Sequence, residues 1–254
     1  MTTSSRLTAL LRDDPVVVTG RGVVAATGFG VENLWEAVAA RRSPARWMEM
    51  PKTSGGTRRV AAFPVAALEW AGHPWGRMAR RLDLGGQYGM AAAFEAVREA
   101  DFAGAPPVSE RLGVIMGSSR GPKGKWVEGQ DLLRAGKRMK PTLAATTTLA
   151  ASAGGICQVL SALGPGWLVS TACASGAYAI AQAAEQILLG HADVMIAGGA
   201  DDTFQELIYA GLEAAGVLAV GGGAAAAADL CRPFARDRNG LVPGSGAGVL
   251  VLES

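Results

Sequence analysis

The chain has 254 residues, of which 49% are hydrophobic and 18% charged, and its formal net charge is +2. This composition is typical of a globular protein with one large or two small domains. The small net charge gives no reason to expect nucleic acid as a partner. The cysteines are too far apart for a metal motif, so no metal is expected: Cys157, Cys173 and Cys231. Their odd number, and the absence of a continuous apolar segment in residues 1–14, predict a cytoplasmic location.

Taken in chain order, five short apolar runs rich in β-formers predict strands: Val16–Thr19, Leu112–Met116, Trp167–Ser170, Val194–Ala197 and Ala247–Leu252. Helical spacing predicts helices between them: Glu32–Ala40, Leu84–Ala100, Trp126–Arg134, Thr147–Leu163, a helix that follows Cys173 and runs to Leu189, and Phe204–Ala215. The stretch Ser43–Arg77 contains four prolines and is interpreted as a long irregular excursion. Strands that alternate with helices predict a layered α/β domain.

No charged residue occurs from Pro141 to Ala184. This stretch does not suit a membrane span, because glycines and a proline interrupt it, and no membrane partner is expected. We expect instead a pair of fully buried helices with a strand between them.

The segment Gly164–Gly190 is the most informative one. It reads as a buried strand, a turn of small residues that contains Cys173, and a helix that ends at Gly190. A thiol at the start of a helix faces unpaired N–H groups and the positive end of the helix dipole, which favour the thiolate and can stabilise an oxyanion. The alternative from position alone is a buried structural cysteine.

Two further motifs are weaker. Gly20-x-Gly22-x-x-Ala25 follows a strand like a dinucleotide fingerprint, but the turn after it is too long. Gly117-Ser118-Ser119-Arg120-Gly121 fits the hydrolase elbow, but Pro122 opposes the helix that must follow, and His191 is the only later histidine.

Several segments resemble the β-ketoacyl-ACP synthases. S-T-A-C-A-S-G at 170–176 is similar to the active-site segment of that family, and A-D-V-M-I-A-G-G-A at 192–200 to its next strand. R-P-F-A-R-D-R-N-G-L-V-P-G-S-G-A-G at 232–248, V-V-V-T-G-R-G at 16–22 and R-R-L-D-L-G-G-Q-Y-G-M at 80–90 resemble three more of its segments, in the same order. The resemblance implies that Cys173 is the nucleophile.

The resemblance also implies a thiolase-like fold, of which residues 1–254 would form the N-terminal half, a mixed five-stranded sheet with helices on both faces. The second half would carry two catalytic histidines, a lysine and a glycine-rich loop. Three positions depart from the family pattern, since Ala235, Asn239 and Ser245 stand where relatives have acids, and we expect charge partners or local hydrogen bonds to be lost there. The resemblance places Arg120 in a loop where relatives often have an apolar residue at the acyl pocket. It makes Leu212 a candidate wall of that pocket, and the alternative for Leu212 is an ordinary core position of its helix.

The implied reaction needs no cofactor. Cys173 would take an acyl group from an acyl carrier protein, and decarboxylation of a malonyl thioester would then drive a Claisen condensation in fatty acid or polyketide synthesis. The implied partners are the carrier protein, acyl and malonyl thioesters, and a second copy or a ketosynthase-like subunit in a homodimer or heterodimer. Two alternatives stay open: a non-catalytic partner subunit that shapes chain length, and a truncated gene product.

Overall fold

The computed structural model describes residues 15–52, 54–101, 107–221 and 226–254, so residues 1–14, on which the predicted location partly depends, lie outside it. The chain forms two compact units. Unit 1 consists of Met1–Val23, Leu68–Asp201 and Ala247–Ser254, and unit 2 of Val24–Ala67 and Asp202–Gly246.

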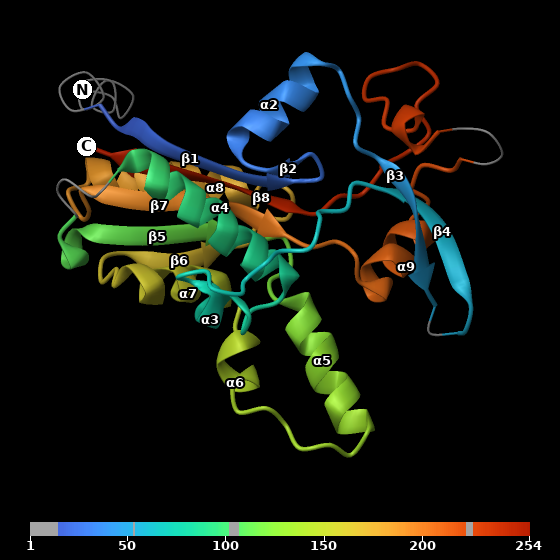
Figure 1. Ribbon diagram of the computed structural model, residues 1–254, viewed down its shortest axis with the longest axis horizontal. Helices are drawn as coiled ribbons and strands as arrows, with labels where there is room; N and C mark the ends of the chain where they lie inside the picture. Colours follow the sequence, from blue (N-terminus) through green and yellow to red (C-terminus); the bar gives the residue numbers. More distant parts are fainter. Residues whose placement is uncertain (1–14, 53, 102–106, 222–225) are drawn as a thin grey trace, which may run out of the picture. The chain divides into compact units, whose positions relative to one another are not determined.

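The main sheet has six strands in the order β2-β1-β8-β7-β5-β6 (Figure 1). The strands are β1 (Val17–Ala25), β2 (Gly28–Phe29), β5 (Leu112–Gly117), β6 (Gly166–Val169), β7 (Val194–Asp201) and β8 (Gly246–Glu253). Strand β5 pairs in parallel with β6 and β7, whereas β1 and β2 are antiparallel, so the sheet is mixed. All five predicted strands are confirmed, and the two-residue β2 adds a sixth.

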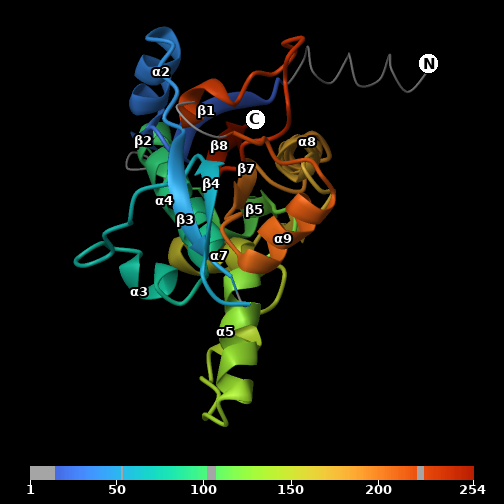
Figure 2. The same cartoon turned by 90° about the vertical axis from the view of Figure 1, so that its right-hand side faces the viewer.

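Helices cover both faces of the sheet in unit 1. Helix α4 (Leu84–Ala100) and α7 (Ala151–Leu160) pack on one face, and α8 (Ser175–Leu188) packs on the other against β5, β6 and β7 (Figure 2). On the α8 side, alternate strand residues such as Ile115 and Met195 meet Ala179, Ala183 and Ile187 in one buried cluster. This two-sided burial explains why β5 is buried at every position.

Shorter helices complete unit 1: α3 (Gly76–Ala79), α5 (Lys123–Arg134), α6 (Leu143–Thr146) and a 3₁₀ turn at Ser109–Arg111. The prediction of a helix at Thr147–Leu163 is wrong for its first turn, because α6 ends at Thr146 and α7 begins only at Ala151. Three consecutive threonine hydroxyls donate to backbone carbonyls there, Thr146 to Thr142, Thr147 to Leu143 and Thr148 to Ala145. Such local bonds compete with the helical ladder.

Unit 2 contains α2 (Val31–Ala39), a hairpin of β3 (Arg46–Pro51) and β4 (Thr57–Ala62), α9 (Glu206–Ala214) and a 3₁₀ turn at Ala227–Asp229. The hairpin corrects our interpretation of Ser43–Arg77 as wholly irregular. Its strands are antiparallel, with Arg46 opposite Ala62 and Pro51 opposite Thr57. Gly55 and Gly56, in the connection between the two strands, both take positive φ, at 92° and 79°, which glycine adopts without steric cost.

The uncharged stretch Pro141–Ala184 is not fully buried, which corrects a second expectation. Leu149, Leu163 and Tyr178 are each more than half exposed. Helix α8 buries only one face, which consists of Ser175, Ala179, Ala183 and Ile187, because the sheet covers only that side. The helices within the described ranges include none with the length and apolar character needed to cross a membrane.

Candidate active site

The candidate site lies where three parallel strands end. Gly117 at the end of β5 pairs with Val169 of β6 and with Gly199 of β7, so the loops after these strands leave the same edge of the sheet. In open α/β sheets, ligands bind outside the carboxyl ends of the strands. The loops at this edge are 118–122 after β5 and 170–174 after β6.

Cys173 lies in the second of these loops, directly before the α8 N-cap residue Ala174. Its side chain is exposed. The predicted position at the start of a helix is therefore confirmed, and the alternative of a buried structural cysteine is wrong. Its role as nucleophile stays a prediction. Cys231 is also exposed, whereas Cys157 is half-buried, and burial raises the pKa of its thiol.

Glycines bring the start of α8 onto the strand ends. A Cβ atom on Gly117 would lie 2.4 Å from the carbonyl carbon of Ser175 and 2.6 Å from the nitrogen of Gly176. A Cβ atom on Gly199 would lie 3.0 Å from the Cα of Gly176. The main chain of the helix thus rests directly on β5 and β7, which fixes the place of the turn that holds Cys173.

The turn itself has an unusual backbone. Ala172 takes a left-handed conformation, with φ at 52°, which costs free energy for a residue other than glycine. The hydroxyl of Ser175 donates to the Ala172 carbonyl at 2.6 Å and accepts from the Thr171 N–H at 2.9 Å. Both neighbours on the N-terminal side of Cys173 are therefore held by one buried side chain, which is 3% exposed.

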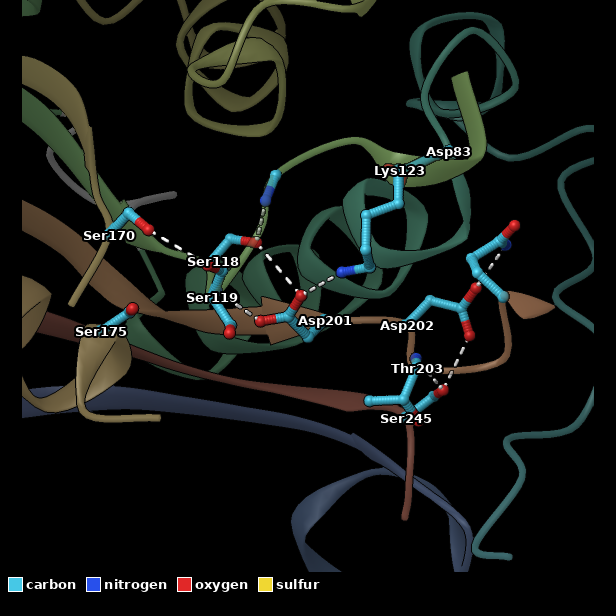
Figure 3. Close-up of polar contacts among 12 residues, drawn as sticks. Asp83, Ser118, Ser119, Lys123, Ser170, Ser175, Asp201, Asp202, Thr203 and Ser245 are labelled. Atoms are coloured by element: carbon cyan, nitrogen blue, oxygen red, sulfur yellow. Dashed lines mark hydrogen bonds and ion pairs between the residues drawn. The ribbon is translucent and has the colours of Figure 1, made fainter. Parts of the chain in front are cut away.

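A second polar network lies at the ends of β5 and β7 (Figure 3). The carboxylate of Asp201 accepts from the Ser119 N–H at 2.7 Å and from the Ser118 hydroxyl at 3.2 Å, and pairs with Lys123 at 2.6 Å. The Ser170 hydroxyl donates to the Ser119 carbonyl at 3.2 Å, which links this loop to the segment that leads to Cys173. Asp201 and Lys123 were not predicted as site residues. The sequence signal that could have indicated Asp201 is the pair of adjacent carboxylates, Asp201 and Asp202, at the end of an apolar strand.

The two predicted acyl-pocket residues belong to different units. Arg120 is exposed in the loop between β5 and α5, in unit 1. Leu212 is half-buried on α9, in unit 2. Their role in an acyl pocket stays a prediction.

The three positions that depart from the family pattern lie in unit 2, and two of them make hydrogen bonds of their own. The Ser245 hydroxyl donates to the buried carboxylate of Asp202 at 2.8 Å and accepts from the Thr203 N–H at 3.1 Å (Figure 3). The side-chain amide of Asn239 donates to the Val220 carbonyl at 2.6 Å. Ala235 has no polar side chain to replace an acid.

The two weaker motifs have structural explanations. Gly20 and Gly22 lie within β1, and Cβ atoms there would lie 2.0 Å and 1.8 Å from carbonyl oxygens of Ala96 and Ala92 on α4, so both glycines allow close strand–helix packing. Ser118 belongs to the Asp201 network, and no helix begins until Lys123.

Neither histidine lies beside Cys173. His73 packs edge-on against Trp70 and Phe94 at centroid distances of 4.8 and 4.4 Å, and burial lowers its pKa. His191 follows the far end of α8, where its Nδ1 lies 3.0 Å from the side-chain oxygen of Gln186. A helix of 14 residues separates it from the thiol by roughly 20 Å.

A mixed sheet with helices on both faces, and a cysteine at the start of one of these helices, is the arrangement expected of one half of a thiolase-like protein. The sequence model described as "Beta-ketoacyl synthase, N-terminal domain" matches residues 13–254. The chain therefore belongs to the β-ketoacyl synthase family.

Named relatives are similar over part of their length. The chain is 34% identical to 3-oxoacyl-[acyl-carrier-protein] synthase 2 of Vibrio cholerae over 240 residues, which cover 94% of this chain and 57% of that protein. It is 33% identical to nodulation protein E of a Rhizobium species, covering 95% of this chain and 58% of the relative. The chain thus spans a little over half the length of these curated relatives.

Solved structures give the same picture. The ishigamide ketosynthase/chain length factor structure is similar with a TM-score of 0.77 and 30% identity, over 94% of this chain and 58% of that one. A β-ketoacyl synthase from Burkholderia phymatum STM815 is similar with a TM-score of 0.76 and 28% identity, over 94% and 59% of the two chains.

Proposed function

We propose that Cys173 accepts an acyl group from an acyl carrier protein thioester. The sulfur attacks the thioester carbonyl, the acyl–sulfur bond to the carrier breaks, and the carrier thiol leaves with a proton. The observation that carries the proposal is the exposed Cys173 thiol at the start of α8 and at the carboxyl ends of three parallel strands. The first amides of a helix lack intrahelical partners and suit an oxyanion at this place.

We further propose that this acyl enzyme takes part in decarboxylative condensation with a malonyl thioester, in fatty acid or polyketide synthesis. An enolate needs hydrogen-bond donors near the acylated sulfur. Among the described residues, the two histidines lie away from the thiol. We propose that further chain, or a ketosynthase-like subunit in a homodimer or heterodimer, supplies these donors for the condensation step.

Similar structures support the proposed partner. One of them, at 26% identity and a TM-score of 0.76, is described as a type II polyketide acyl carrier protein in complex with its ketosynthase. We propose the same class of carrier here, and we propose that Arg120 and Leu212 contribute to binding of the acyl chain.

The test is acylation in solution. The purified protein is incubated with acyl carrier protein that bears a labelled acyl chain, with and without a candidate second subunit, and the peptide containing Cys173 is weighed by mass spectrometry. We expect an acyl adduct on wild-type protein and none on Cys173→Ala. Absence of the adduct in both incubations, with the protein folded, would contradict the proposal.

A second candidate function is that of a non-catalytic subunit that shapes chain length. The observation that favours it is the likeness to a structure described as a ketosynthase/chain length factor. In a reconstituted pair, loss of product with Cys173→Ala would exclude this role, whereas unchanged product would support it.

A further inference from the structure

The turn before Cys173 depends on one side chain. Ser175 is the first residue of α8 and is 3% exposed, yet its hydroxyl reaches backward to two residues of the preceding turn. It accepts from the N–H of Thr171 at 2.9 Å and donates to the carbonyl of Ala172 at 2.6 Å. The hydroxyl thus makes one bond as acceptor and one as donor, and both bonds end on main-chain atoms.

The turn at residues 171–174 needs these two hydrogen bonds, which we call the Ser175 clamp. Ala172 holds a left-handed φ of 52°, a conformation that persists in residues other than glycine only when surrounding contacts enforce it. The remaining bonds of this turn are longer, 3.2 Å from the Ala174 N–H to the Thr171 carbonyl and 3.2 Å from the Ser175 N–H to the Ala172 carbonyl. The Ser175 hydroxyl therefore supplies the two shortest contacts of the turn.

The residue that makes the Ser175 clamp also packs directly on the sheet. The main chain of Ser175 rests on Gly117 at the end of β5, where no side chain intervenes. Because Cys173 lies between the clamped residues and the anchored one, its position follows from theirs. Its own side chain is exposed.

We propose that Ser175 is a positioning residue for Cys173: its hydroxyl holds the strained Ala172 turn so that the sulfur stays at the amino end of α8. Ser175 does not touch the acyl group in this proposal. The proposal rests on the proposed function only for its acylation readout, since the reactivity of the thiol toward a small alkylating agent is independent of any carrier protein.

The first experiment compares Ser175→Ala with Ser175→Thr, which keeps the hydroxyl. Iodoacetamide labelling of Cys173 is followed peptide by peptide, with the exposed Cys231 of the same molecule as internal reference. We expect Ser175→Ala to slow labelling of Cys173 at least fivefold relative to Cys231, and Ser175→Thr to recover most of the rate. The matched control is Thr148→Ala, which also removes a hydroxyl that donates to a backbone carbonyl three residues earlier, and it leaves the ratio unchanged. An unchanged ratio in Ser175→Ala would overturn the proposal.

Acylation separates this proposal from the proposed function. We expect Ser175→Ala to lower the rate constant of acyl transfer while the concentration of acyl carrier protein at half-maximal rate stays within twofold. If wild-type Cys173 is labelled rapidly but never acylated, the proposed function fails and the positioning role stands. If acylation proceeds equally in wild type and Ser175→Ala, the positioning role fails and the proposed function stands.

A measurement on the wild-type protein needs no variant. Thr171 is exposed, and its N–H donates to the Ser175 hydroxyl. In native-state hydrogen exchange, the Thr171 amide should therefore exchange at least tenfold more slowly than its intrinsic rate. Exchange at the intrinsic rate would overturn the proposal even if Ser175→Ala failed to fold.

Discussion

Substitution of Gly117 by alanine tests the packing that places the thiol. The added Cβ atom would lie 2.4 Å from both the carbonyl carbon and the carbonyl oxygen of Ser175. Non-bonded heavy atoms prefer about 3.5 Å or more, so about 1 Å of overlap must be relieved. Every atom involved is main chain, which cannot rotate away as a flexible side chain would. Relief therefore requires the start of α8 to move off the sheet.

The expected cost follows from two opposing effects. Overpacking of a core costs about 1–3 kcal/mol, and rigid neighbours favour the upper end of this range. Alanine also restricts the conformations of the unfolded chain, and this effect offsets about 0.4–1 kcal/mol of the overpacking cost. We expect a net loss of about 2 kcal/mol in the free energy of unfolding, or roughly 4–8 °C in melting temperature for a chain of this size.

The assay is thermal and urea unfolding of Gly117→Ala beside Gly248→Ala, combined with labelling of Cys173. Gly248 is the matched control, because it also lies in a strand and its added Cβ would meet nothing within 4 Å. We expect the control to melt within about 2 °C of wild type and to keep Cys173 reactivity. If Gly117→Ala were as stable as the control and labelled at the same rate, the reasoning on main-chain packing would be refuted.

Three further predictions concern other parts of the chain. Tyr209→Phe should raise the free energy of unfolding in urea by about 1 kcal/mol, because the buried Tyr209 hydroxyl has no hydrogen-bond partner among the described residues. Burial, and then the charge of Asp202, raise the pKa of this hydroxyl to about 12. A loss of stability in Tyr209→Phe would contradict this prediction. Hydrogen bonds from Lys140 and Lys125 lower the pKa of Glu128 below its ordinary value of 4.5. These ion pairs therefore stabilise the α5–α6 region fully above pH 4.5, and their stabilisation is lost as the pH falls through the lowered pKa. Hydrogen exchange in α5, corrected for intrinsic rates, should show protection at pH 6 that weakens near pH 3, while α7 keeps its protection; equal loss in both helices would argue against it. A double-mutant cycle of Asp201→Asn and Lys123→Met should give a coupling energy of about 1–3 kcal/mol, since the Lys123 side chain is only 12% exposed. A coupling energy below about 0.5 kcal/mol would be inconsistent with the ion pair.

The parts of the fold that depend on burial were predictable from the sequence. Strand β5 is buried at all six positions, and its uninterrupted apolar run was sufficient to predict it. Helix α4 begins at Leu84 as expected, because the Asp83 carboxylate caps it by accepting from the Gly86 N–H at 3.0 Å. The start of α8 was equally predictable, since small residues precede a helical pattern there.

Features that depend on distant partners were not predictable from local patterns. Strands β3 and β4 carry arginines such as Arg58, whose charge is matched by Glu213, 155 positions away. Asp201 likewise acts on Ser119 and Lys123 across about 80 residues. A local window contains only one member of each pair, so spacing within the window gives no signal. The two-residue β2 is also too short to produce a pattern.

The order of strands in the sheet has a consequence for synthesis. The last strand, β8, lies between β1 and β7, and the Thr19 hydroxyl donates to Glu253, 234 positions later, at 2.6 Å. While the nascent chain is still on the ribosome, β1 therefore has only the short β2 as a neighbour, whereas β5, β6 and β7 can already pair around the Cys173 turn. Strand β1 can join the other strands of the sheet only after residues 246–253 emerge, so the turn that holds Cys173 can form before the sheet is complete.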